Sequence, residues 1–181
     1  MMKRSTMLSW CLAGLLAAGC AGAPDPPPPP PAPPADPGPC DLLTPDEVRT
    51  VLGEAVLHGE ASGFECTYTR PPTEVAMRYQ AVKLRLEFGD VDPYVLLSNY
   101  QATLRNALGD YDPAPLSGVG DAAAWDGDTI AATVALTPTR SAFVSVQLRE
   151  VDPALEQRYA QMLVEQGIAN LKQRIASAAG R

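Results

Sequence analysis

Apolar and polar residues alternate along four stretches of the chain, which predicts β-strands. In the clearest of them, Val82, Leu84 and Leu86 alternate with charged residues. The four stretches are residues 64–69, 75–88, 130–136 and 142–148. Alternation of this kind is typical of antiparallel strands that bury one face and expose the other.

Helix signals separate these strands. Thr44 and Glu47 form a capping box that opens a short helix, and Gly53 ends it. The triplet Val-Asp-Pro occurs at 91–93 and again at 151–153, each time after a predicted strand and before a helical pattern. Two interpretations of this repeat remain open: a duplicated unit of one hairpin and one helix, or a common capping device used twice.

The order of elements predicts one α+β domain. We expect an antiparallel sheet of four or five strands with the helices packed on one face. Asp126 and Gly127 predict a tight hairpin turn, because Asp-Gly adopts positive backbone angles readily. Residues 110–121, rich in proline and glycine, are predicted to form a loop.

The first twenty residues have the layout of a secretory signal peptide. Lys3 and Arg4 precede a short apolar run, and small residues lead to Cys20. The run is about half as long as a membrane-spanning helix requires, so a permanent span is not expected. An ordinary signal peptide, cut near the small residues without use of Cys20, is the alternative.

Residues 16–20, Leu-Ala-Ala-Gly-Cys, resemble the bacterial lipobox, although Ala17 stands where that motif usually has leucine. The resemblance implies removal of residues 1–19 and fatty acyl chains, such as palmitate, on Cys20. Two or more chains would anchor the protein stably in a membrane. The expected location is the bacterial cell envelope, at the outer membrane of a Gram-negative cell or otherwise on the outer face of the cell membrane.

Proline dominates residues 24–39 and excludes helices and central strands there. We expect a polyproline II stalk that reaches roughly 50 Å. A ligand for a proline-reading domain is the alternative. The predicted organisation is therefore a signal peptide at 1–19, an acylated cysteine and proline-rich stalk at 20–39, and a single domain at 40–181.

Charge limits the classes of partner. The net charge is −7, and loss of Lys3 and Arg4 with the signal peptide would make it −9. This balance argues against nucleic-acid binding and against electrostatic binding to anionic lipid.

Cys40 and Cys66 are the cysteines left for the domain once Cys11 is removed and Cys20 is acylated. In an oxidising compartment such a pair predicts a disulfide. A metal or redox pair, the competing interpretation, requires closer spacing or more ligands.

Several motifs together resemble small bacterial secreted lipoproteins that carry a domain of unknown function. The first is Pro39-Cys40-Asp41-Leu42-Leu43-Thr44 with its helix, followed by a second cysteine in the first strand. A further motif is the stretch Gly118-Val119-Gly120-Asp121, which precedes a hairpin. The resemblance covers about residues 39–148 and implies a fold and a cell-surface role without a reaction.

Catalytic motifs are weak in this sequence. His58 is the sole histidine, and no nucleophile elbow, two-histidine metal spacing or phosphate-binding loop occurs. Glu60 with Glu65 is a candidate carboxylate pair for sugar hydrolysis. Three aspartates in one segment suggest calcium binding, although their spacing does not match a calcium loop and turn chemistry explains them equally well. They are Asp121, Asp126 and Asp128.

We therefore expect a non-enzymatic binding or adaptor domain, displayed on the cell envelope, without a metal or other cofactor. Its expected partners are the membrane, through the lipid on Cys20, and another envelope protein or a small apolar ligand between helices and sheet. The alternative is an unusual envelope hydrolase that uses His58 with nearby carboxylates.

Overall fold

The computed structural model describes residues 35–57, 59–72 and 80–180, which belong to one compact unit. The predicted signal peptide, Cys20 and most of the stalk lie outside the described residues. The elements, in chain order, are η1 Pro39–Asp41, α1 Pro45–Leu52, β1 Glu60–Ser62, β2 Glu65–Thr69, β3 Gln80–Gly89, α2 Pro93–Leu108, β4 Ala114–Leu116, β5 Ala122–Trp125, β6 Thr129–Thr137, β7 Arg140–Leu148 and α3 Pro153–Ala179.

The α+β class is confirmed, and the sheet is larger than expected. Seven antiparallel strands lie in the order β1-β2-β3-β7-β6-β5-β4. Three strands lie outside the four predicted stretches: β1 and β4, which have three residues each and occupy the two edges, and β5, which has four residues. Strand β4 lies within the stretch predicted as loop. None of these three short strands shows the sustained alternation of apolar and polar residues from which the other four were predicted.

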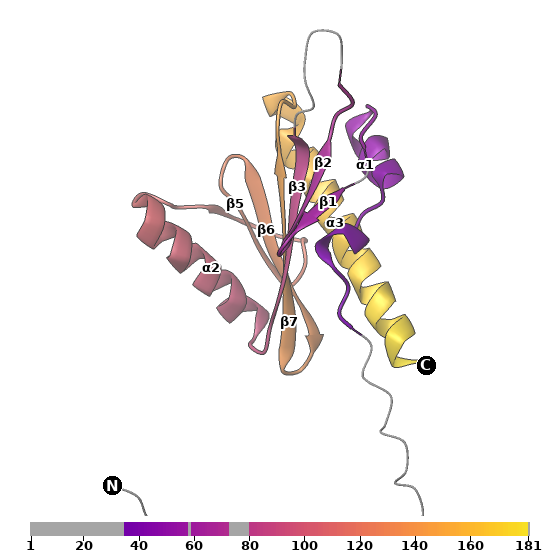
Figure 1. Ribbon diagram of the computed structural model, residues 1–181. Coiled ribbons are helices and arrows are strands. Elements are labelled where there is room, and N and C mark those ends of the chain that lie inside the picture. The colour runs from indigo at the N-terminus through magenta and orange to yellow at the C-terminus, as the bar shows by residue number, and fades with distance from the viewer. Residues whose placement is uncertain (1–34, 58, 73–79, 181) are drawn as a thin grey trace, which may run out of the picture. The chain divides into compact units, whose positions relative to one another are not determined.

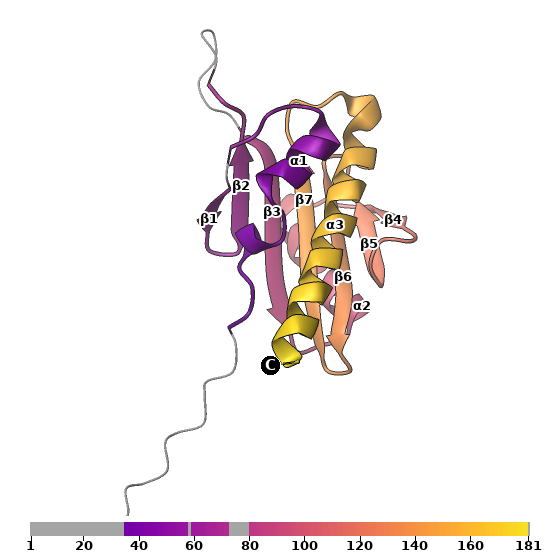
Figure 2. The same ribbon diagram turned by 90° about the vertical axis from the view of Figure 1, so that its right-hand side faces the viewer.

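The prediction that the helices share one face is wrong. Helices α1 and α3 cover one face of the sheet, and α2 covers the other (Figures 1 and 2). Successive residues of a strand point to opposite faces of the sheet and therefore belong to different cores. Val144 belongs to the larger core on the α3 side, whereas Phe143 packs with Leu97 of α2. Phe143 occupies a position that alternation assigned to solvent, and α2 buries it.

The Val-Asp-Pro repeat caps two helices that are not related by symmetry. Asp92 and Asp152 cap α2 and α3, and a proline opens each helix. Strands β3 and β7 lie side by side and antiparallel. A two-fold rotation that exchanged these two strands would have its axis perpendicular to the sheet. Such a rotation would place the helices that follow the two strands on the same face. Since α2 and α3 lie on opposite faces, the repeat reflects a shared capping device.

The first helix confirms its predicted start and end. Thr44 accepts a hydrogen bond from the Glu47 backbone N–H at 3.2 Å, Glu47 accepts one from the Thr44 backbone N–H at 2.6 Å, and Gly53 ends the helix at φ +72°. Leu43 and Val48 are both buried in the larger core. In the described part of the chain, no helix is long and apolar enough to cross a membrane.

Candidate functional site

Helix α2 is fastened to the sheet mainly by its first half. Pro93 and Leu97 are the buried residues of this helix. The Thr133 hydroxyl donates a hydrogen bond to the Pro93 carbonyl at 2.9 Å, and the rings of Tyr100 and Phe143 lie with their centroids 4.4 Å apart. These contacts fix the start and the middle of α2 on strands β6 and β7.

The second half of α2 extends away from the sheet (Figure 1). Residues 105–108 are all exposed, and 68% of Leu108 is accessible to solvent. The helix ends at Gly109, which has φ +80°. A helix held at one end in this way leaves open space along its flanks, and two hollows occur there.

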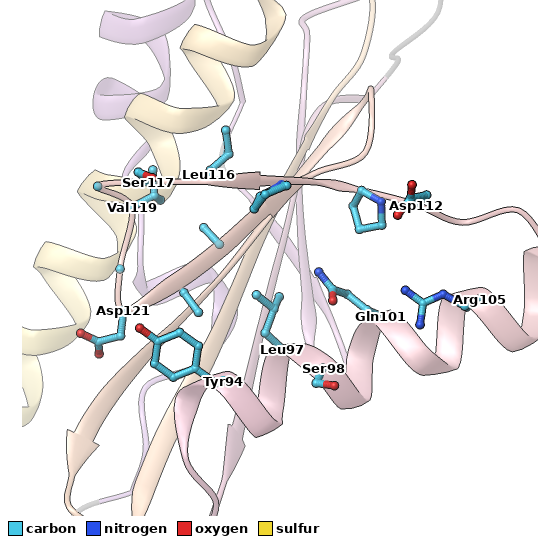
Figure 3. Close-up of a pocket in the computed structure, with 16 residues that line it drawn as sticks. Tyr94, Leu97, Ser98, Gln101, Arg105, Asp112, Leu116, Ser117, Val119 and Asp121 are labelled. Atoms are coloured by element: carbon cyan, nitrogen blue, oxygen red, sulfur yellow. The ribbon is translucent and has the colours of Figure 1, made fainter.

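The first hollow, here called the helix groove, lies between α2 and residues 112–121 and has a volume of about 630 Å³. Figure 3 shows Tyr94 and Asp121 at one end, Arg105 and Asp112 at the other, and Leu97 between them. Ser98 and Gln101 also line the stretch between the ends, so the middle of the groove is mixed in polarity and its ends are polar.

A close backbone contact and hydrogen bonds to β6 fix the wall of the helix groove that lies opposite α2. Gly120 has φ +60°, and a Cβ atom there would lie 2.6 Å from the Thr133 carbonyl oxygen, so only glycine fits. Asp121 donates its backbone N–H to that same carbonyl, and its carboxylate accepts a hydrogen bond from the Ala135 N–H at 2.7 Å. These bonds tie the wall to strand β6.

The second hollow, here called the polar wedge, opens between the second half of α2 and the sheet and has a volume of about 280 Å³. Its floor consists of side chains on the sheet face that α2 leaves open, and its roof comes from α2 and Tyr111. The lining residues are Glu65, Lys83, Arg85, Tyr100, Leu104, Leu108, Tyr111, Asp126, Asp128, Thr129, Ser145 and Gln147.

The β5–β6 turn supplies two carboxylates of the polar wedge, and Glu65 on β2 supplies another. Asp126 accepts hydrogen bonds from the backbone N–H of Thr129 at 2.8 Å and from the Tyr111 hydroxyl at 3.2 Å. Asp128 accepts a hydrogen bond from the Gln147 side-chain amide at 2.8 Å, and Arg149 lies 3.9 Å away. Gly127, at φ +106°, forms the tight turn that the sequence predicts.

The two carboxyl groups of this turn have pKa values displaced in opposite directions. Burial raises the pKa of Asp126, and the adjacent negative charge of Asp128 adds to the effect. Burial alone would also raise the pKa of Asp128, but hydrogen bonds from Thr129 and Gln147 outweigh it, and the pKa is lowered. The pKa values of two neighbouring carboxyl groups move apart in this way when the environments of the groups differ.

Two tyrosines stay protonated beside these carboxylates. Burial, together with the negative charge of Asp126, raises the pKa of Tyr100 to about 12. The same two causes raise the pKa of Tyr111. At neutral pH both hydroxyls are therefore hydrogen-bond donors.

The three aspartates considered for calcium do not form one site. Asp126 and Asp128 share the turn, whereas Asp121 is bonded to Ala135 on β6. Among the described residues, no group of three or more side chains suitable for a metal ion occurs.

The hydrolase candidates are only partly placed. His58 lies outside the described residues, so its proximity to carboxylates stays a prediction. Glu60 pairs with Thr67 across β1 and β2, which puts it on the same sheet face as Glu65. Glu65 forms an ion pair with Lys83 at 2.8 Å.

Cys40 and Cys66 form the expected disulfide, with their Cα atoms 5.0 Å apart. It joins η1, at the start of the domain, to β2. Cys20, the predicted lipidation site, and Cys11 lie outside the described residues, so acylation stays a prediction.

Sequence patterns gave little indication of Tyr100, Tyr111 and Gln147, which line the polar wedge. Phe143 was the available signal, because a large aromatic residue on a predicted solvent face requires something to cover it. The identity of the covering helix depends on contacts between residues about forty positions apart, such as that between Tyr100 and Phe143.

No protein-family model, no curated protein and no solved structure matches this chain.

Proposed function

We propose that this protein is a lipid-anchored bacterial envelope protein whose domain binds another polypeptide along helix α2 and does not itself catalyse a reaction. The anchor is the acylated Cys20, and the proline-rich segment carries the domain away from the membrane. The negative net charge of the chain supports a protein partner over nucleic acid.

The observation that carries this proposal is the exposure of apolar side chains on α2. The described part of the chain exposes six large apolar residues, and three of them lie at the start of α2 or directly before it. These three are Val91, Tyr94 and Val95, exposed by 37%, 66% and 47%. Apolar groups gathered on one exposed element are typical of an interaction site. Covering the exposed parts of Tyr94 and Val95 would contribute on the order of 1 kcal/mol each, since both side chains are already partly covered.

The helix groove suits an extended polypeptide. Eleven residues separate Tyr94 from Arg105, which corresponds to about 16 Å along the helix axis. About five residues of extended chain have that length. The polar ends of the groove can orient such a segment by hydrogen bonds and charge, while Leu97 and its neighbours accept an apolar side chain. A wholly apolar small molecule would form no hydrogen bond with these polar ends.

Site-directed photo-crosslinking in intact cells tests the polypeptide partner. A photoreactive phenylalanine analogue at position 94 is expected to give one discrete adduct. The matched control carries the same analogue at Lys172, which is exposed on α3. The adduct at position 94 should weaken when Val95→Asp is added, because a charge then replaces part of the apolar surface. Absence of an adduct, or the same adducts at both positions, would contradict the proposal.

Mass spectrometry of the protein extracted from membranes tests the anchor separately. The expected N-terminal residue is Cys20, carrying fatty acyl chains. A Cys20→Ser variant should leave the membrane fraction, because a domain without acyl chains has no comparable attachment. An unmodified thiol at Cys20, or a mature N-terminus further along the chain, would overturn this part of the proposal.

A further inference from the structure

The floor of the polar wedge is built by strand register. Lys83 on β3 pairs with Gln147 on β7, which pairs with Thr129 on β6. Arg85 and Ser145 pair in the same way one row further along, and Glu65 on β2 pairs with Arg85. Directly paired residues point to the same face of a sheet. The register therefore sets two rows of polar side chains side by side beneath α2.

The roof of the polar wedge is different in character. Tyr100, Leu104 and Leu108 come from successive turns of α2, and Tyr111 follows the helix. Leu108 lies on the unfastened half of α2, where 68% of its surface remains exposed. An apolar roof thus faces a polar floor across an open space.

The charges on the floor are largely balanced. Lys83 pairs with Glu65, and Arg85 pairs with Glu87. Asp128 lies near Arg149 and accepts a hydrogen bond from Gln147, and Asp126 accepts bonds from Thr129 and Tyr111. A bound ion would have to displace these partners. Hydroxyl groups, which donate and accept, can join the same network without adding charge.

We propose that the polar wedge binds a neutral sugar, either free or at the end of a carbohydrate chain, with its hydroxyls on the paired rows of the floor and the C–H face of the ring against Tyr100, Leu104 and Leu108. A sugar ring presents hydroxyls at its edge and C–H groups on its faces, which matches this floor and roof. A hollow of about 280 Å³ is slightly below the usual range of ligand-site volumes, about 300–1,000 Å³, and suits one sugar ring.

This site is additional to the polypeptide surface and does not depend on it. The helix groove and the polar wedge lie on the two flanks of α2, and their linings share no residue. Loss of the adduct at Tyr94 would therefore leave the carbohydrate site in place, and the reverse also holds.

Saturation-transfer NMR on the full-length protein in detergent micelles tests the carbohydrate site. The probes are glucose, galactose, mannose, arabinose and N-acetylglucosamine, each as the free sugar and as a tetrasaccharide. At least one neutral probe should receive magnetisation from the protein. A tetrasaccharide signal confined to its terminal rings indicates a polymer end, and equal signals from a free sugar indicate a small-molecule ligand; either outcome supports a neutral sugar site.

Two variants locate the binding. Leu108→Ser removes part of the roof, and Gln147→Ala removes a floor amide; each should weaken the interaction about tenfold. Met162→Ser is the matched control, because Met162 is an exposed apolar residue on α3, and binding should be unchanged. Circular dichroism verifies folding.

Three results would overturn this inference. The first is the absence of a signal from every neutral probe. The second is a signal that Leu108→Ser and Gln147→Ala leave unchanged, since the sugar would then bind elsewhere. The third is stronger binding of glucuronate or glucosamine than of the neutral sugars, since charge would then decide recognition.

Discussion

Arg70 shows how one buried charge can join distant segments. This residue is 6% exposed. It donates hydrogen bonds to the carboxylate of Glu54, to the Arg149 carbonyl at 3.1 Å and to the Glu150 carbonyl at 3.3 Å. Glu150 has φ +55°, a left-handed backbone that is uncommon for a residue other than glycine. Arg70 thus connects the end of β2 to the junction between β7 and α3.

Arg70→Leu should therefore destabilise the fold. The substitution leaves two carbonyls and the Glu54 carboxylate without this donor. We expect the free energy of unfolding to fall by about 2–3 kcal/mol. This is less than for a fully buried ion pair, because Glu54 is partly exposed. Urea unfolding measures the free energy. Arg174→Leu, at an exposed position on α3, is the control and should change it by under about 0.5 kcal/mol. Equal effects of the two substitutions would refute this role.

Glu47 makes stability depend on pH. Burial alone would raise its pKa, but hydrogen bonds from Thr44, Asn170 and Gln166 hold the pKa below the usual 4.5. A carboxyl group whose pKa is lowered by folding stabilises the folded state above its unfolded pKa. That contribution disappears as the pH falls through the folded pKa.

Glu47→Ala should cost about 1 kcal/mol near neutral pH, as loss of a helix cap usually does. The difference from the unchanged protein should shrink at a pH of about 3, where the carboxylate is increasingly protonated in both states. Denaturant titrations at the two pH values measure it. A cost that stays the same at low pH would mean that Glu47 acts through packing instead of through its charge.

At the scale of elements, α2 and α3 differ in how firmly they are held. Six residues of α3 are buried, against two of α2. Asn170 of α3 also donates hydrogen bonds to the Leu42 carbonyl at 2.8 Å and to Glu47 at 2.9 Å, which fastens α1 to α3. Elements with few buried contacts open locally at lower free energy than the rest of a fold.

Hydrogen exchange should therefore show α2 opening before α3. We expect the amides of residues 102–108 to exchange fastest among the helices described here, since that half of α2 lies off the sheet. Leu97→Ala removes the main apolar contact and should cost about 2–3 kcal/mol while increasing exchange along the whole of α2. Mass spectrometry of peptides measures both effects. Equal protection of α2 and α3 would contradict the geometry.

At the scale of the whole molecule, the disulfide closes the start of the domain onto its sheet. Cys40 and Cys66 are 26 residues apart, and Cys66 is fully buried in the larger core. Close by, the Tyr68 hydroxyl donates a hydrogen bond to the Leu43 carbonyl at 2.5 Å. Asp36, which precedes η1, forms an ion pair with Arg140 at the start of β7. Several contacts therefore hold the start of the domain, directly after the proline-rich segment.

Replacement of both cysteines by alanine should lower the free energy of unfolding by about 3.5 kcal/mol, the chain-entropy value for a loop of this length. Thermal unfolding of the two forms measures the difference. Reduction of the unchanged protein should reproduce most of it, because it opens the same loop. A difference under about 1 kcal/mol would show that the neighbouring contacts already constrain the loop in the unfolded chain.

Local sequence determined the elements whose signals lie within a few residues. The capping box at Thr44, the Asp-Pro helix starts, the Asp126-Gly127 turn and the alternating strands all follow from backbone preferences and short-range hydrogen bonds. The Cys40–Cys66 pairing followed from counting cysteines, given the predicted compartment. The α+β class followed from the order of these elements.

Only the tertiary structure decided which face each helix covers, and with that the position of both hollows. Helices α2 and α3 begin with the same Val-Asp-Pro triplet, yet they pack on opposite faces, because α2 buries Leu97 against Phe143 while α3 buries its apolar face against the larger core. The edge strands β1 and β4 likewise depend on tertiary structure, because each forms only against a neighbouring strand of the sheet. Contacts between residues distant in sequence set these features, so local patterns could not predict them.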